Sequence, residues 1–142
     1  MLQHKTVTVV VLKDDRVLLV KRPDSQSSPG KWVTPGGHVE DRETVNLAAL
    51  REMQEEIGGV ENLEQIGMPF VHDVNGPKSG PHQHICQIFK ASKSDEPIID
   101  KTEADDWGWF KPEEAIRLDL TDWAERALRE VKFLNRDHKR NI

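Results

Sequence analysis

Two apolar runs near the start of the chain constrain its fold more than any other feature. Residues 6–12 are dense in valine, and residues 16–21 contain Val-Leu-Leu-Val, with the turn formers Asp14 and Asp15 between them. This pattern predicts two strands joined in a hairpin. Because both runs are nearly continuous instead of alternating, each strand is expected to be buried on both faces. The sequence therefore predicts a sheet that is covered by helices.

The rest of the chain supplies further elements in an order that suits such layers. Strands are predicted at residues 31–37, 70–74, 84–91 and 106–110, and helices at 43–57, from 112 onward and at 121–134. Polar loops are predicted at 23–30 and 75–81, and a frayed tail at 136–142. This succession predicts an α/β chain that forms a single domain over residues 1–142.

The predicted helix at 43–57 carries glutamates where a helix disfavours them. Glu52 and Glu56 lie one turn apart on one face, with Glu55 beside them. Like charges at this spacing repel, and the C-terminal end of a helix already bears partial negative charge. A merely solvated face would mix its charges, whereas only Arg51 offsets these. A hard cation such as Mg²⁺ would turn the repulsion into coordination, so the helix predicts a metal site.

The same helix carries apolar residues on its other faces. Leu47, Leu50 and Ile57 lie away from the glutamates, while Ala48 and Ala49 lie nearer to them. A helix that is apolar on two sides and charged at one end is expected to lie between two layers, with its acidic end open to a cleft.

The stretch around this helix resembles a known motif, G-x5-E-x7-R-E-U-x-E-E-x-G-U, where U is a bulky aliphatic residue. Its positions are filled by Gly37, Glu43, Arg51, Glu52, Met53, Glu55, Glu56 and Gly58. This is the Nudix box, and the chain resembles the Nudix hydrolases, in particular the MutT-like nucleotide hydrolases. One position departs from the pattern, because Gly59 stands where the family usually has an aliphatic residue and Val60 follows it. The resemblance implies an α/β/α sandwich with a mixed central sheet between helices.

The resemblance also implies an activity. Nudix enzymes hydrolyse nucleoside diphosphates linked to another moiety, and the short MutT-like chain favours a nucleoside triphosphate that yields the monophosphate and pyrophosphate. The alternatives are an ADP-ribose or nucleotide-sugar pyrophosphatase and a non-catalytic domain that senses nucleotides. ADP-ribose hydrolases often carry a proline about sixteen residues after the box, where this chain has Asn75, with Pro77 nearby. An intact glutamate set argues against the sensor.

The residues assigned as metal ligands are Glu52, Glu55 and Glu56. The resemblance also implies a backbone carbonyl ligand from the Gly36-Gly37 turn, and this role is assigned to Gly37. The cofactor would be Mg²⁺, with Mn²⁺ as a possible substitute. Arg51 would orient the carboxylates, and Glu43 would support them or add a ligand.

The general base is left open between Glu55 and two residues of a later acidic loop, Glu103 and Asp105. The two glycines of the turn are expected to adopt special backbone angles and to approach a ligand closely.

Substrate contacts are predicted on both sides of the glycine turn. Arg22 and His38 could contact phosphates, and Trp32 or Phe89 could stack on a nucleobase, although core packing explains the aromatic residues at least as well. His72, His82 and His84 lack the tight spacing of a zinc-binding helix, so the sequence argues against zinc.

Composition excludes several other classes of function. The formal net charge of −5 argues against a nucleic acid polymer as partner, and the expected partner is a small nucleotide. The single cysteine, Cys86, allows no intrachain disulfide. No apolar run reaches membrane-spanning length, and the first residues lack a signal peptide pattern, so the expected location is the cytoplasm. Family members often dimerise, so a homodimer is possible.

Overall fold

The first apolar run forms the central strand of a mixed sheet. The computed structural model describes residues 2–76, 78 and 80–139, and within them seven strands form one sheet. The strands are β1 (Gln3–Lys13), β2 (Arg16–Lys21), β3 (Trp32–Val33), β4 (Gly36–His38), β5 (Glu61–Gly76), β6 (Gly80–Ser92) and β7 (Asp106–Phe110). The helices are α1 (Val45–Ile57), α2 (Pro112–Ala115) and α3 (Asp122–Glu130).

Two short strands, β2 and β4, pair with different parts of the same edge of β1. β1 pairs with β2 at Leu12↔Val17, as the predicted hairpin requires, and with β4 nearer its start, at Thr6↔His38. Along its other edge β1 runs parallel to β6 over its whole length, from Gln3↔Gln83 to Leu12↔Ser92. The Gly-rich strand β4 is thereby held at the centre of the sheet, next to the start of β1.

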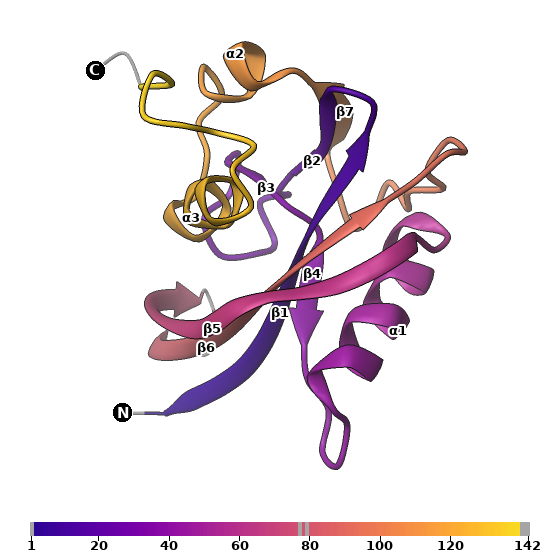
Figure 1. Cartoon of the computed structure of the whole chain (residues 1–142). Helices are drawn as coiled ribbons and strands as arrows, with labels where there is room; N and C mark the ends of the chain where they lie inside the picture. Colours follow the sequence, from indigo (N-terminus) through magenta and orange to yellow (C-terminus); the bar gives the residue numbers. More distant parts are fainter. Residues whose placement is uncertain (1, 77, 79, 140–142) are drawn as a thin grey trace.

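The sheet has a hydrophobic core on each face, as the continuous apolar runs predict. Val7, Val9 and Val11 of β1 pack toward α1, whereas Val10 packs toward α3 together with Leu128. In Figure 1, α1 and α3 lie on opposite sides of the strands. The predicted α/β/α sandwich is therefore confirmed.

The predicted second apolar face of α1 is wrong. Leu47 and Leu50 are 56% and 49% exposed, whereas Ile57, which was assigned to the same face, is buried in the core with Ala48 and Ala49. A helix that covers an outer face of a sheet needs only one apolar face, and α1 lies in such an outer layer. The helix begins at Val45, two residues after the predicted start, where Thr44 accepts a hydrogen bond from the Leu47 N–H. It ends at Ile57 as predicted, and Gly58 adopts a left-handed conformation there.

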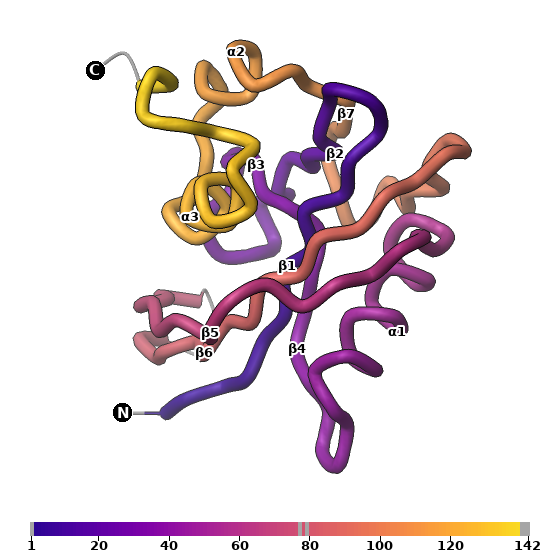
Figure 2. Tube along the Cα trace, viewed as in Figure 1, coloured from indigo at the N-terminus to yellow at the C-terminus, as the bar shows by residue number. Residues whose placement is uncertain are grey.

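The strand predicted at 70–74 is the later part of a much longer one, β5. β5 and β6 form a hairpin that still pairs at Asn75↔Pro81 and Gly76↔Gly80, so most of the loop predicted at 75–81 is strand. Figure 2 follows the two strands of this hairpin across the sheet. Most residues of 61–69 are exposed, and the apolar residues among them are scattered between polar ones, so this segment gave no clear strand signal. Pro77 lies outside the described residues.

The C-terminal part of the chain is more ordered than its composition predicts. α3 begins at its predicted cap, Thr121, but ends at Glu130 instead of at 134. Arg129 then donates hydrogen bonds to the backbone carbonyls of Asn135 at 2.8 Å and His138 at 2.7 Å, which contradicts fraying over this part of the tail. Residues 140–142 lie outside the described residues. Among the described residues, no helix is long and apolar enough to span a membrane.

Candidate functional site

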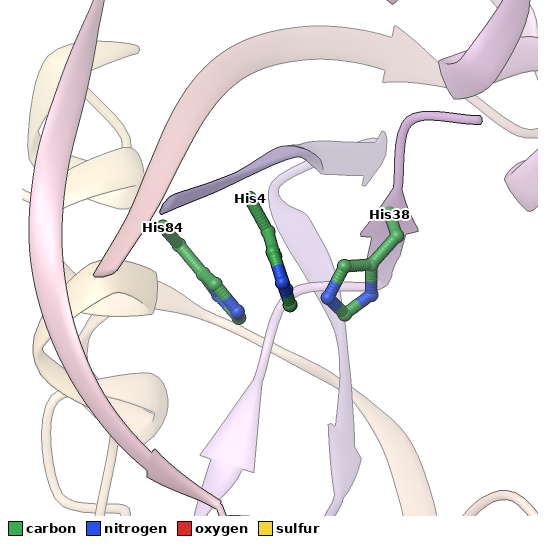
Figure 3. Close-up of side chains that lie close together, drawn as sticks. All are labelled: His4, His38 and His84. Atoms are coloured by element: carbon green, nitrogen blue, oxygen red, sulfur yellow. The ribbon is translucent and has the colours of Figure 1, made fainter. Parts of the chain in front are cut away.

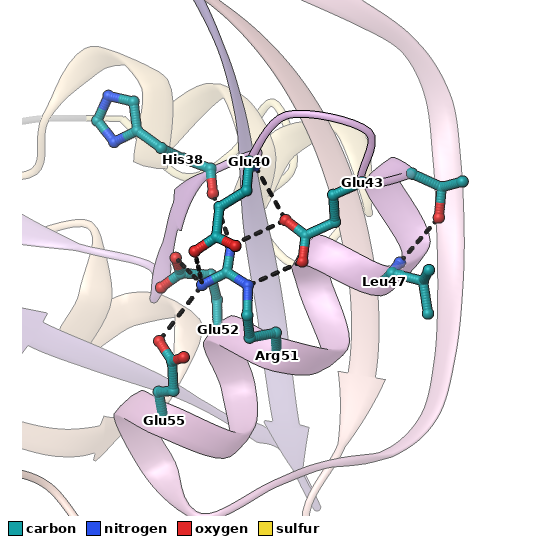
Figure 4. Close-up of polar contacts among 8 residues, drawn as sticks. His38, Glu40, Glu43, Leu47, Arg51, Glu52 and Glu55 are labelled. Carbon is teal, nitrogen blue, oxygen red and sulfur yellow. Dashed lines mark hydrogen bonds and ion pairs between the residues drawn. The ribbon is translucent and has the colours of Figure 1, made fainter.

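Arg51 organises the acidic end of α1. Its guanidinium donates two hydrogen bonds to the Glu43 carboxylate, at 2.8 and 2.9 Å, and one to Glu52 at 3.0 Å. It also donates to Glu55 at 3.3 Å and to the backbone carbonyl of His38 at 2.9 Å. Figure 4 places the guanidinium at the centre of these groups. One cation thus fixes three carboxylates and the end of β4, as predicted for a residue that orients the glutamates.

Glu43 is held as an anion by this arginine. The two hydrogen bonds from Arg51, together with one from the Glu40 backbone N–H at 3.0 Å, lower the pKa of Glu43 to about 2. The same pairing raises the pKa of Arg51 above its ordinary value. Glu43 therefore acts as the partner that positions Arg51, and both of its carboxylate oxygens are engaged within the protein.

Gly37 lies directly against the Glu52 carboxylate. A Cβ atom on Gly37 would overlap the carboxylate carbon and both oxygens of Glu52, and one on Gly36 would overlap the carbonyl of Val7. Neither glycine has a positive φ, so the predicted special backbone angles are wrong. The reason for glycine here is close approach: β4 must fit between β1 and the glutamates of α1.

Glu56 is the most perturbed carboxyl of the site. It accepts a hydrogen bond from the Gly36 N–H at 3.0 Å, but burial raises its pKa to about 8, with further contributions from Glu52 and Glu103. Burial also raises the pKa of Glu52, against the opposing effect of Arg51. At neutral pH Glu56 therefore holds its proton in the metal-free protein, and a bound cation would favour its ionised form. The donor set of the two carboxyls is oxygen only, which fits a hard divalent ion.

A pocket of about 540 Å³ opens beside these carboxyls. The predicted site residues that line it are Arg22, Gly37, His38, Arg51, Glu52, Glu56 and Glu103. Glu55, by contrast, has a side chain that is 60% exposed and points to Arg51. Asp105, the other base candidate, is exposed, and its backbone N–H bonds to the carbonyl of Lys21. Of the two residues in the acidic loop, Glu103 is the one placed at the pocket.

Two residues that were predicted to contact a nucleobase, Phe89 and Trp32, do not line this pocket. Phe89 is fully buried in the core between the sheet and α1, where its ring has no exposed face, so the structure does not support its predicted contact with a nucleobase. Trp32 packs edge-on against Phe110 with ring centroids 5.3 Å apart. Core packing, the other interpretation of these residues, therefore describes both of them.

An aromatic residue that the sequence did not single out for the site does line the pocket. Trp123 of α3 stacks on His72 at 5.0 Å, and the Arg22 guanidinium lies over its ring at 5.5 Å. Arg22 is itself held by Ser27, through hydrogen bonds of 2.5 Å to the carbonyl and 2.9 Å to the hydroxyl. Trp123 lies in the helix predicted at 121–134, and nothing in the sequence of that helix separates a pocket wall from a core position.

Arginines and buried carboxyls around one pocket are the groups that a hydrolase of phosphoanhydride bonds uses. A NUDIX domain model matches residues 2–131. The nucleoside triphosphatase NudI of Escherichia coli O139:H28 (strain E24377A / ETEC) is 30% identical over 137 residues, which cover 91% of this chain and 96% of that protein. The chain therefore belongs to the NUDIX family.

Solved structures agree with this family. The MutT NUDIX hydrolase from Burkholderia pseudomallei superposes with a TM-score of 0.77 at 27% identity, covering 93% of this chain and all (100%) of that one. The E. coli dihydroneopterin triphosphate pyrophosphohydrolase superposes with a TM-score of 0.71 at 20% identity, covering 90% and 95% of the two chains, which shows a shared fold.

Proposed function

We propose that this chain is a Mg²⁺-dependent nucleoside triphosphate pyrophosphohydrolase, which releases the nucleoside monophosphate and pyrophosphate. The observation that carries the proposal is the partly buried pair Glu52 and Glu56, packed on Gly36-Gly37 and facing the same pocket as Arg22. Similarity to a nucleoside triphosphatase over 91% of the chain supports the choice of substrate class. The pocket volume of about 540 Å³ lies in the range of small-ligand sites.

Glu52 and Glu56 would hold the cation, with the Gly37 carbonyl and Glu55 as further ligands. When bound, Mg²⁺ neutralises phosphate charge and helps to generate the nucleophile, and Mn²⁺ can replace it. Arg51 keeps the Glu52 carboxylate in place through its bond of 3.0 Å, and Glu43 keeps Arg51 in place. Through these contacts the protein itself would hold the Glu52 carboxylate in position before a substrate binds.

The opposite wall of the pocket would bind the substrate. Arg22 would offer a guanidinium to the phosphates, and the ring of Trp123 supports that guanidinium through a cation–π contact. His38 follows the glycines directly and lines the same pocket.

Glu103 is the stronger candidate for the general base. It lines the pocket and lies close enough to Glu56 to raise the pKa of that carboxyl. A base must reach the attacking water, and Glu103 is on the pocket side, whereas Glu55 faces solvent beside Arg51. Glu55 remains the alternative base if it is not a metal ligand.

A substrate panel tests the proposal. The protein would be incubated with Mg²⁺ and nucleoside triphosphates, ADP-ribose or a nucleotide sugar, and phosphate or pyrophosphate release would be measured. We expect at least one triphosphate to be hydrolysed faster than the other classes, and EDTA to abolish the reaction. Preference for ADP-ribose would support the second candidate, and binding without turnover would support the sensor.

The predicted homodimer, the cytoplasmic location and the single domain stay predictions.

A further inference from the structure

Histidines from four strands meet on the α3 side of the sheet. His72 of β5, His84 of β6 and His4 of β1 are direct cross-strand neighbours, because His72 pairs with His84 and His84 pairs with His4. His38 of β4 joins them from the other edge of β1, where its strand pairs with Thr6. His82 lies two residues before His84, on the same face. The sheet order thus gathers side chains that are far apart in the sequence.

Three of these rings present their nitrogens to one another. One ligand atom from each of His4, His38 and His84 lies within 4.8 Å of the other two. Figure 3 shows the three rings side by side, from three different strands. In a tetrahedral zinc site the ligand nitrogens are separated by roughly 3.3 Å, given metal–nitrogen bonds of about 2.0 Å. Binding a metal would bring the three nitrogens closer together than the upper limit of 4.8 Å.

His82 orients the central ring of the cluster. Its Nδ1 lies 2.9 Å from the Gly80 carbonyl, which can only accept, so Nδ1 carries the proton. With both rings neutral, His82 Nε2 then accepts the hydrogen bond of 3.1 Å from His84 Nε2, which leaves the lone pair of His84 on Nδ1. Histidine ligands in metal sites are commonly fixed by such a bond from the second ring nitrogen.

An unprotonated imidazole nitrogen is the atom that binds a transition metal. The Nδ1 atom of His4 is buried and has no hydrogen-bond partner among the described residues. A buried lone pair or N–H without a partner is costly unless something binds it.

We propose that His4, His38 and His84 form a second metal site, selective for a borderline transition metal such as Zn²⁺. Three imidazoles leave the fourth tetrahedral position open, and all three residues line the pocket that also contains Glu52 and Glu56. Nitrogen ligands distinguish this site from the oxygen-only carboxylate site, which suits Mg²⁺. The proposal does not depend on the hydrolase activity, since it concerns metal binding alone.

A titration with Co²⁺ separates the two sites, because tetrahedral nitrogen coordination gives a strong visible absorption and octahedral oxygen coordination a weak one. The metal-free protein would be titrated in excess Mg²⁺, which occupies the carboxylates. We expect one equivalent of Co²⁺ to produce the strong band. His84→Gln and His4→Gln should each weaken this binding by at least roughly 100-fold, since even outer partners of metal ligands change affinity 10- to 100-fold. Glu56→Gln should leave it unchanged.

Unchanged binding in both histidine variants, or loss of the band in Glu56→Gln alone, would overturn the proposal. A second measurement needs no variant: the ring nitrogens of the wild-type histidines are followed by NMR during addition of Zn²⁺. We expect resonances of His4, His38 and His84 to shift together and to saturate at one equivalent. If none of the three responds to Zn²⁺, the site does not exist.

Discussion

Glu56 combines burial, a neighbouring carboxyl and a single backbone hydrogen bond. Glutamine at this position keeps the shape and can still accept from the Gly36 N–H, but it cannot carry the charge that holds a cation. We therefore predict that Glu56→Gln folds normally and loses turnover by about 100-fold or more, the scale of removing one charge-stabilising group from an active site. Steady-state kinetics with Mg²⁺ and thermal unfolding measure the two effects.

The matched control is Glu64→Gln, which makes the same chemical change on the exposed part of β5. It should retain wild-type turnover. Near-normal turnover in Glu56→Gln would show that the metal assignment on α1 is wrong.

The raised pKa of Glu56 also predicts how stability depends on pH in the metal-free protein. The folded state binds this proton up to about pH 8, whereas the unfolded chain releases it near its ordinary pKa of 4.5. The free energy of unfolding should therefore fall as the pH rises from about 4.5 to about 8, by roughly 4 kcal/mol. Denaturant unfolding in EDTA at several pH values measures this.

Two comparisons control that experiment. Glu56→Gln should lack the decrease, and Mg²⁺ should reduce it in the wild type, because a bound cation stabilises the carboxylate. Equal pH dependence of the wild type and Glu56→Gln would contradict the electrostatic account of this residue.

At the scale of elements, the site depends on how closely β4 approaches α1. Gly37 has an ordinary backbone conformation, so alanine is tolerated by the backbone but its Cβ must displace the Glu52 carboxylate. We predict that Gly37→Ala lowers turnover by roughly 100-fold, since a shift of about 1 Å in a catalytic group can cost that much. Kinetics over a range of Mg²⁺ concentrations should also show weaker metal binding, as a rise in the Mg²⁺ concentration that gives half-maximal turnover.

Gly67→Ala serves as the control, because it should lower stability and leave turnover unchanged. Gly67 has a φ of 63° and open space around its Cβ position, so alanine there strains the backbone without touching the site. It should cost about 1 kcal/mol of stability and leave turnover intact. If Gly37→Ala instead lost only stability, the close packing of β4 on Glu52 would have no catalytic role.

At the scale of the whole molecule, the local parts of the fold and site could be predicted from sequence and the cross-strand parts could not. The caps of α1, the two buried faces of β1 and β2, and the arginine among glutamates all follow from spacing within one element. The exposed part of β5 at 61–69 pairs through its backbone and shows no regular apolar alternation. Neighbours such as His4 and His84 depend on β1 lying parallel to β6, an order that no local spacing encodes.

The central claim is hydrolysis of a nucleoside triphosphate between its α- and β-phosphates by carboxylate-bound metal. The most direct test is ³¹P NMR of the products formed with Mg²⁺ from the best triphosphate of the panel. The account predicts nucleoside monophosphate and pyrophosphate in equal amounts. Nucleoside diphosphate and orthophosphate would contradict the proposed cleavage position, and an absence of turnover on every triphosphate would contradict the proposed activity.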